Sequence, residues 1–315
     1  SAFFVNLEDD DLKIKNFLIK NNIKILLFSV NVHNSFPLKV ARIAKSINIG
    51  TLHLLDYWSN YSLRMKLDGR DIFEPSKYLV PDQFAKNKSI TEGINPKIIE
   101  ISGQPAFADS EQAYLKNKSN SPNNIFNEFK DKKCILFISE PVAFDQGISI
   151  KENKNFRGYV EKDSLEVLVK GLKKLDEFFF VIVLPHPRQN IKELENIWKS
   201  LGGDNYGCVA PKLRSRDLLP YVSGICGMAS TLLYEAWLLG IPVLSIQPGL
   251  IDDSLRMMQN KDQVGFIDNH KSSIKITKQW LKSLSYKTKN DIQEDLLLHI
   301  KAPNLVVKEI IKLID

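Results

Sequence analysis

The sequence predicts an α/β protein built from two doubly wound parallel sheets. Short apolar runs alternate with amphipathic segments along the 315 residues, as in strand–helix–strand units. This length suits two domains of ordinary size, and 43% apolar residues can fill more than one core. A polar stretch without periodicity at 116–124 separates two such series and indicates a linker.

The first series begins the chain and supplies about four strands. Acidic residues in the first turn favour a helix at 9–21, and the segment at 37–47 predicts a helix with a basic face. The remaining expected elements are strands at 24–30, 51–55, 77–80 and 97–102, a short additional strand at 2–5, and a helix at 82–92.

The second series follows the polar stretch and is longer. The apolar run 178–184 predicts a buried strand, and Gly240 ends a helix that opens after Ser230. Further strands are expected at 133–139, 208–210, 222–226 and 241–246, and further helices at 162–175, 191–201, 213–221, 273–284, 290–301 and 304–313.

Composition narrows the classes of function. The net charge of +6 is modest, and lysines alternate with acidic residues rather than forming a basic block, so no nucleic-acid partner is expected. The cysteines Cys134, Cys208 and Cys226 lack metal-ligand spacing and suit a reducing compartment. We find neither a membrane-spanning stretch nor a signal peptide, which predicts a cytoplasmic protein and leaves peripheral contact with the inner membrane face open. The chain starts at Ser1 rather than Met, so whether this is a native start is open.

Two motifs follow predicted strands and point to a phosphate. His186, Pro187 and Arg188 come directly after the strand at 178–184, and Ser230 and Thr231 open the helix after 222–226. Ligands of open α/β sheets bind at the carboxyl ends of the strands, and a helix N-terminus suits an anion. The alternatives are a loop histidine that caps carbonyls, a solvated arginine, and an ordinary helix cap.

Four further polar residues are candidates for the same site. Glu235 interrupts an apolar helix, and either ribose hydroxyls or a neighbouring Arg or Lys would partner it. Asp56 ends the strand at 51–55 and is a candidate general base, or else it caps the next segment or pairs with Arg64. Glu140 and Gln247 also follow strands; their alternatives are a solvated loop carboxylate and a turn residue.

With these residues placed, the chain resembles the two-domain glycosyltransferases of the GT-B fold. His186-Pro187 and the later Ser230-Thr231 are similar to motifs of bacterial sialyltransferases and of the capsule enzymes that use CMP-sialic acid or CMP-Kdo. The resemblance covers roughly residues 50–250. It implies two Rossmann-like domains that face a cleft, with a reduced N-terminal domain, because such domains usually have six or seven strands.

The resemblance also implies the organisation of the chain. Residues 1–115 would form an acceptor-side domain, 116–131 a linker and 132–302 a nucleotide-sugar-binding domain. The final helix, 303–315, would pack back on the first domain, as in the fold.

The implied activity is a metal-independent glycosyltransferase. It would move a sugar from a nucleotide-sugar donor, CMP-linked by resemblance, to a glycan or glycolipid acceptor, with no cofactor beyond that substrate. His186, Ser230 and Thr231 would hold the phosphate and Glu235 the ribose. The alternatives are a sugar-nucleotide epimerase, a polyol-phosphate transferase, and a non-catalytic nucleotide-sugar-binding subunit.

Overall fold

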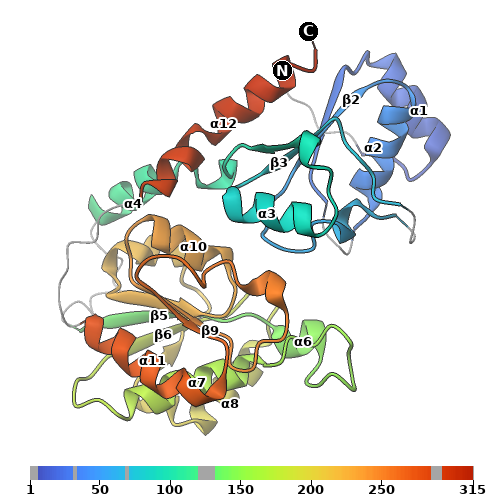
Figure 1. Ribbon diagram of the computed structural model, residues 1–315. Helices are drawn as coiled ribbons and strands as arrows, with labels where there is room; N and C mark the ends of the chain where they lie inside the picture. Colours follow the sequence, from blue (N-terminus) through green and yellow to red (C-terminus); the bar gives the residue numbers. More distant parts are fainter. Residues whose placement is uncertain (1–5, 31–33, 68–70, 120–131, 285–292, 315) are drawn as a thin grey trace. The chain divides into compact units, whose positions relative to one another are not determined.

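The computed structural model describes residues 6–30, 34–67, 71–119, 132–284 and 293–314 (Figure 1). The chain forms two compact units, Ser1–Ala108 with Leu297–Asp315, and Asp109–Leu296. Helix α4 (Ser110–Ser119) therefore counts with the second unit, whereas the sequence analysis places the end of the first domain at residue 115. The expected strand at 2–5 and linker residues 120–131 lie outside the described residues.

The first unit contains a parallel sheet of four strands in the order β1-β2-β3-β4. Within the described residues, this confirms the expectation that the N-terminal domain has fewer strands than is usual. Its helices α1 and α3 begin at side-chain caps, since Asp10 and Asp82 accept backbone N–H groups. The elements are β1 (Ile25–Phe28), β2 (Gly50–Leu54), β3 (Lys77–Val80), β4 (Ile99–Ile101), α1 (Asp11–Lys20), α2 (Phe36–Ser46) and α3 (Gln83–Thr91).

The C-terminal segment is one helix, α12 (Asp295–Ile311), with Pro303 inside it. The sequence predicts two helices separated near this proline, because proline usually ends a helix. The last turns pack on the first sheet, where Val306 contacts a cluster with Leu52 and Leu79.

The second unit contains a parallel sheet of six strands in the order β10-β9-β8-β5-β6-β7. Helix α10 covers one face of this sheet and helices α7, α8 and α11 cover the other, so the unit is doubly wound as predicted (Figure 1). The strands are β5 (Cys134–Ile138), β6 (Phe180–Leu184), β7 (Gly207–Val209), β8 (Gly224–Gly227), β9 (Val243–Ile246) and β10 (Val264–Ile267). The helices are α6 (Val142–Gln146), α7 (Glu161–Leu172), α8 (Ile191–Ser200), α9 (Ser215–Leu218), α10 (Thr231–Leu238) and α11 (His270–Ser283).

Strand β10 is the one strand of this sheet that the sequence analysis missed. It is a short edge strand, it contains Gly265, and three of its four residues are only partly buried, so it lacks the continuous apolar run of the central strands. The central strands β5, β8 and β9 are buried throughout, and they contain the buried cysteines Cys134 and Cys226, as expected.

Short 3-10 turns complete the description. They lie at Leu63–Met65, Pro96–Ile98, Pro105–Phe107, Gly203–Asn205, Leu219–Tyr221 and Asp253–Leu255.

Two glycines bring the loop before α7 against the loop after β9. Gly158 and Gly249 both have φ of +97°, and a Cβ on Gly158 would lie 1.9 Å from the Gly249 carbonyl oxygen. The Ile251 N–H donates to the Arg157 carbonyl at 3.0 Å across the same contact. Only glycine allows the two loops to approach this closely. The contact fixes the positions of Arg157 and Gly158, which precede Tyr159.

A buried histidine occupies the middle of the first sheet. His53 of β2 pairs in register with Phe28 and Tyr78, and its ring packs against both of theirs. The residue is fully buried, and neither ring nitrogen has a hydrogen-bond partner among the described residues. Burial, assisted by the nearby Arg64 guanidinium, lowers the pKa of His53 from its ordinary value of 6.5 to about 3.

This histidine should make the first unit sensitive to acid. Between pH 6.5 and about 3 the unfolded chain binds a proton at His53 that the folded chain does not. The free energy of unfolding should therefore fall as pH falls, by up to about 1.4 kcal/mol per pH unit from this residue. Urea unfolding of wild type and His53→Phe at several pH values measures the slope. Equal slopes in the two proteins would contradict the assignment.

The glycine contact gives a second stability prediction. Gly158→Ala should lower the free energy of unfolding of the second unit by about 3 kcal/mol, because the new methyl group meets backbone. Gly202→Ala is the control, since Gly202 also has positive φ (+74°) but its neighbours lie 3.6 Å away. We expect about 1 kcal/mol there, from backbone strain alone. Similar losses in both variants, measured by urea unfolding, would rule out the steric explanation.

Candidate functional site

The order of the second sheet places a topological switch point between β5 and β8. From β5 the chain continues to β6 and β7 on one side, and then to β8, β9 and β10 on the other. The helices that follow β5 and β8 therefore cross to opposite faces of the sheet. This arrangement opens a crevice at the carboxyl ends of the two strands, where ligands of such sheets bind.

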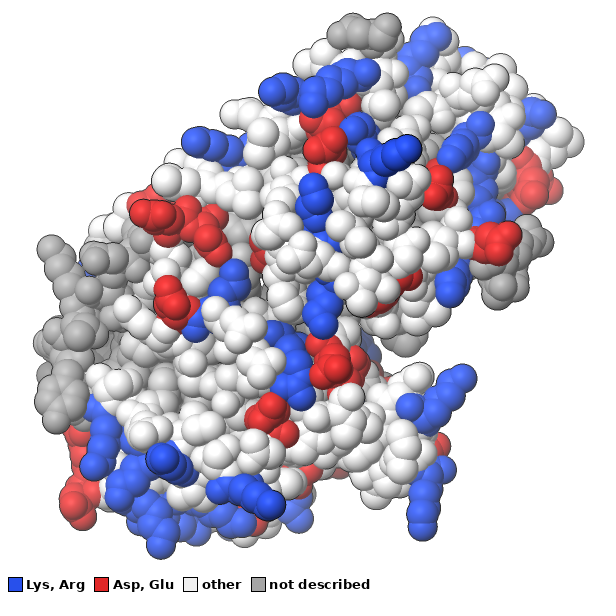
Figure 2. Space-filling view, viewed as in Figure 1, with Lys and Arg blue, Asp and Glu red and all other residues white. Residues whose placement is uncertain are grey.

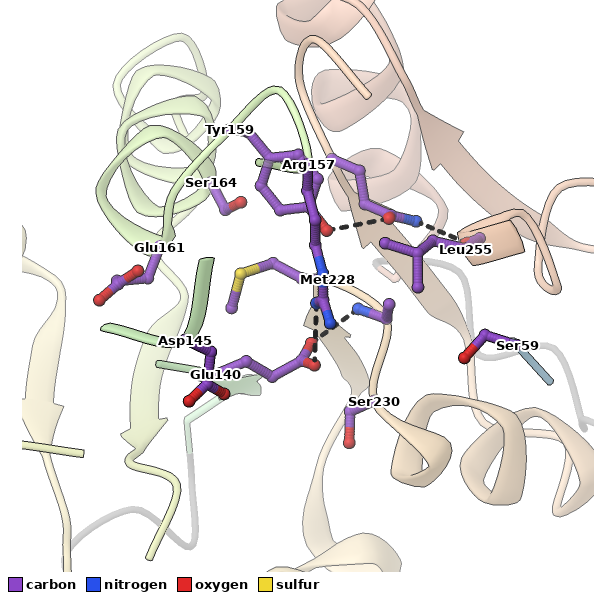
Figure 3. A network of polar contacts seen from close by, with 12 residues as sticks. Ser59, Glu140, Asp145, Arg157, Tyr159, Glu161, Ser164, Met228, Ser230 and Leu255 are labelled. Atoms are coloured by element: carbon purple, nitrogen blue, oxygen red, sulfur yellow. Dashed lines mark hydrogen bonds and ion pairs between the residues drawn. The ribbon is translucent and has the colours of Figure 1, made fainter. Parts of the chain in front are cut away.

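Polar groups from both strands meet at this point. Glu140 follows β5 and Ala229 follows β8, and the Ala229 N–H donates to Glu140 Oε2 at 2.7 Å (Figure 3). The guanidinium of Arg157 lies beside the same carboxylate, with Nη1 3.8 Å from Oε1. The Glu140 and Arg157 side chains are only 17% and 18% exposed, so the pair is largely desolvated. Glu140 is thus partnered inside the protein. The sequence suggested either a ligand-binding residue or a solvated loop carboxylate, and neither interpretation anticipates these partners.

Arg157 is a residue that sequence reasoning missed. It stands just before the Gly158-Tyr159 turn, and its local sequence resembles a solvated loop. A local signal is the adjacent glycine, because glycine is favoured where the backbone must approach a ligand or another segment closely.

The N-terminus of α10 lies next to Glu140 in space, because Ala229, which donates to Glu140, immediately precedes the N-cap Ser230. Ser230 is the N-cap, with φ −64° and ψ 140°, and its hydroxyl accepts the Leu232 N–H at 3.3 Å. Thr231 is the first helical residue. The backbone N–H groups of Ser230 and Thr231 have no partner within the described residues, so the helix end can donate to an anion.

The His-Pro turn follows β6, the strand on the other side of β5. The Nδ1 atom of His186 accepts the Arg188 N–H at 3.2 Å, which puts the ring proton of a neutral imidazole on Nε2. Arg188 itself makes a two-pronged ion pair with Asp145 of α6, at 2.7 and 2.8 Å. Pro187 is exposed. The structure thus leaves His186 Nε2 as the donor of this turn and engages Arg188 elsewhere.

Gln247 has a structural role. It is fully buried, and its Oε1 accepts the Tyr159 hydroxyl at 3.0 Å. Its Nε2 donates to Ser245 Oγ at 3.0 Å and to the Leu255 carbonyl at 3.2 Å (Figure 3). Both amide protons are used within the protein, and contact of Gln247 with a base or sugar remains a prediction.

Glu235 also finds its partners within the second unit. Its carboxylate accepts the Ser110 hydroxyl at 2.7 Å and the Arg216 Nε–H at 3.0 Å, and the residue is 3% exposed. Burial raises the pKa of Glu235. The neighbouring arginine is the structural alternative named from the sequence; ribose binding remains a prediction.

Asp56 belongs to the first unit, where it follows β2. Its Oδ1 accepts Arg64 Nη1–H at 2.7 Å, and its side chain is 53% exposed. Arg64 is only 7% exposed and also donates to the carbonyls of Val30 and Ser59. The Gln104 amide donates to the Asp56 carbonyl at 3.2 Å, so this loop is held from two sides. The expected pairing of Asp56 with Arg64 is present, and its role as a base remains a prediction.

The described residues were also searched for a metal site, a basic surface and a membrane-spanning helix. No group of three or more His, Cys, Asp or Glu side chains in these ranges is placed to hold a metal ion. On the face shown in Figure 2, lysine and arginine side chains are interspersed with acidic ones. Within the same ranges, no helix combines the length and apolar character needed to cross a bilayer.

Comparison with known proteins identifies the fold. Neither the models of known protein families nor the curated proteins match the chain. Among solved structures, the chain is similar to the UDP-GlcNAc 2-epimerase from Methanocaldococcus jannaschii, with a TM-score of 0.63 and 16% identity over 96% of this chain and 80% of that one. The enzyme from Neisseria meningitidis bound to UDP-GlcNAc gives 0.64 and 15%, with 96% and 80% covered. The M. jannaschii enzyme in complex with UDP-GlcNAc and UDP gives 0.61 and 16%, with 95% and 79% covered.

These similarities confirm the two-domain, Rossmann-like fold of the GT-B type. They also correct one expectation: the prediction of a glycosyltransferase is wrong, because the similar structures are 2-epimerases, which are isomerases. None of the three similar structures named above is a sialyltransferase or a Kdo transferase. The physical reason for the error is that the strand-end motifs indicate a nucleotide phosphate, and one fold can hold such a phosphate for different reactions.

Proposed function

We propose that the protein binds a uridine diphosphate sugar at the switch point of the second sheet and inverts one carbon of the sugar. The substrate we propose is UDP-N-acetylglucosamine and the reaction is epimerisation at C2. Support comes from the similar structures, whose names describe 2-epimerases, two of them with UDP-GlcNAc bound.

The observation that carries the proposal is the set of donors at the switch point. The N–H groups of Ser230 and Thr231 at the start of α10 and the Nε2–H of His186 follow β8 and β6, on either side of β5. Backbone donors at a helix N-terminus stabilise the negative charge of a diphosphate. Arg157 adds a cation beside them.

Epimerisation, unlike sugar transfer, requires no acceptor molecule. Inversion at C2 breaks one C–H bond and forms another on the opposite face, so substrate and product are stereoisomers and no second substrate is consumed. The reaction needs a group that removes the proton and a group that returns one. Asp56, which Arg64 holds in place, is our candidate for the first role.

The activity test uses solvent deuterium. Purified protein incubated with UDP-N-acetylglucosamine in deuterated water should yield the C2 epimer with deuterium at C2, which NMR detects directly. Asp56→Asn should keep UDP binding and lower turnover by at least about a hundredfold, since general bases typically contribute this much. UDP binding without turnover of any UDP-sugar would instead identify a non-catalytic nucleotide-sugar binder.

The binding test isolates one backbone N–H. Thr231→Pro removes the donor at the first helical position, where proline is well tolerated, and the backbone of Ser230 already suits a following proline. We expect the dissociation constant for UDP to rise about tenfold, as for loss of one charge-assisted hydrogen bond. Thr231→Ala, which removes only the hydroxyl, is the matched control. Calorimetry that shows equal affinity for Thr231→Pro and Thr231→Ala would refute the placement of the phosphate.

A further inference from the structure

A carboxylate already occupies one donor of the proposed phosphate site. Ala229, Ser230 and Thr231 are consecutive, and their N–H groups form a row of donors where α10 begins. Glu140 Oε2 accepts the first of them at 2.7 Å, whereas the next two have no partner within the described residues (Figure 3). The Glu140 carboxylate therefore sits where a helix N-terminus favours an oxygen of a phosphate.

The same carboxylate engages the nearby cation. Arg157 Nη1 lies 3.8 Å from Glu140 Oε1, and both side chains are largely buried. Little water surrounds the pair, so charges at this point act on one another with weak screening. Because Glu140 offsets the positive charge of Arg157, this arginine attracts a second anion less strongly than an uncompensated arginine would.

A phosphate at the same helix terminus would lie close to Glu140. Consecutive residues of a chain are about 4 Å apart, so an oxygen held by the Ser230 N–H lies within about one residue of the donor that Glu140 occupies. Two anions at such a separation repel each other, and the repulsion is strong where water is largely excluded. Like-charge contacts of this kind lower affinity and exclude unwanted ligands.

We propose that Glu140 is a specificity-determining residue that competes with the phosphate of the ligand for the N-terminus of α10 and for Arg157. An anion that binds by its charge alone, such as inorganic phosphate, is repelled. A nucleoside diphosphate offers further contacts through its nucleoside, and these offset the repulsion. This inference rests on the proposed function for the identity of the nucleotide.

Calorimetry on Glu140→Gln tests the proposal. Glutamine keeps an acceptor oxygen for the Ala229 N–H but removes the negative charge. We therefore expect the dissociation constants for UDP and for inorganic phosphate each to fall at least about tenfold. Glu177→Gln is the matched control, because it removes the same charge from an ion pair with Lys133, which immediately precedes β5 at the other end of that strand. Its affinities should equal those of wild type.

A second measurement uses the wild-type protein and does not depend on the folding of Glu140→Gln. Arg157 should exchange Glu140 for the phosphate when UDP binds. The side-chain Nε–H resonance of Arg157 should therefore shift during an NMR titration with UDP. A resonance that stays unchanged while UDP binds would overturn the competition for Arg157.

The outcomes separate this inference from the proposed function. Wild-type protein that binds no UDP would contradict the proposed function, while the inorganic phosphate titrations of wild type and Glu140→Gln would still decide the role of Glu140. Equal or weaker binding of both ligands by Glu140→Gln would overturn the inference. An equal gain of affinity in Glu177→Gln would also overturn it, because the gain would then follow from net charge rather than from the position of Glu140.

Discussion

The candidate site depends on the hydrogen bond from the Ala229 amide to the Glu140 carboxylate. It joins the ends of β5 and β8 at the point where the chain reverses its direction across the sheet. A largely buried carboxylate is costly unless it is partnered, and here a backbone N–H and Arg157 partner it. Because Ala229 immediately precedes the cap of α10, this bond also orients the free donors of the helix.

Those donors explain why transfer and isomerisation are hard to distinguish from such a sequence. Both reactions start from a sugar that is linked to a nucleotide through phosphate, and the groups that hold the phosphate lie at strand ends for reasons of topology. The motif His186-Pro187 and the cap at Ser230 therefore indicate the ligand class, while the reaction depends on groups near the sugar. Asp56 of the first unit is the base that we propose.

Apolar runs were sufficient to predict most of the fold. The buried strands β5, β6, β8 and β9 and the cap at Ser230 are local features, so the sequence shows them directly. Strand β10 was missed because an edge strand with a glycine has a weak local pattern. The continuity of α12 was missed because tertiary packing overrides the usual effect of Pro303.

The partners of the polar candidates were harder to predict because they come from distant parts of the chain. Gln247 bonds to Tyr159 across 88 residues, and Glu235 bonds to Ser110 across 125. No local pattern carries such pairings. The exception is Asp56 with Arg64, eight residues apart, which the sequence offered as an alternative.

Pro303 has a consequence for how α12 behaves as a helix. A helix forms cooperatively, because each hydrogen bond of the ladder makes the next one easier to form. Proline has no N–H, so the helical hydrogen bond that residue 303 would donate one turn back is absent and the ladder is interrupted there. The two ends of α12 are therefore coupled more weakly than in an unbroken helix. Packing therefore holds each end separately: before the proline, His299 and Ala302 are fully buried and His299 Nδ1 accepts the Gln104 N–H at 2.9 Å, and after it Val306 packs on the first sheet.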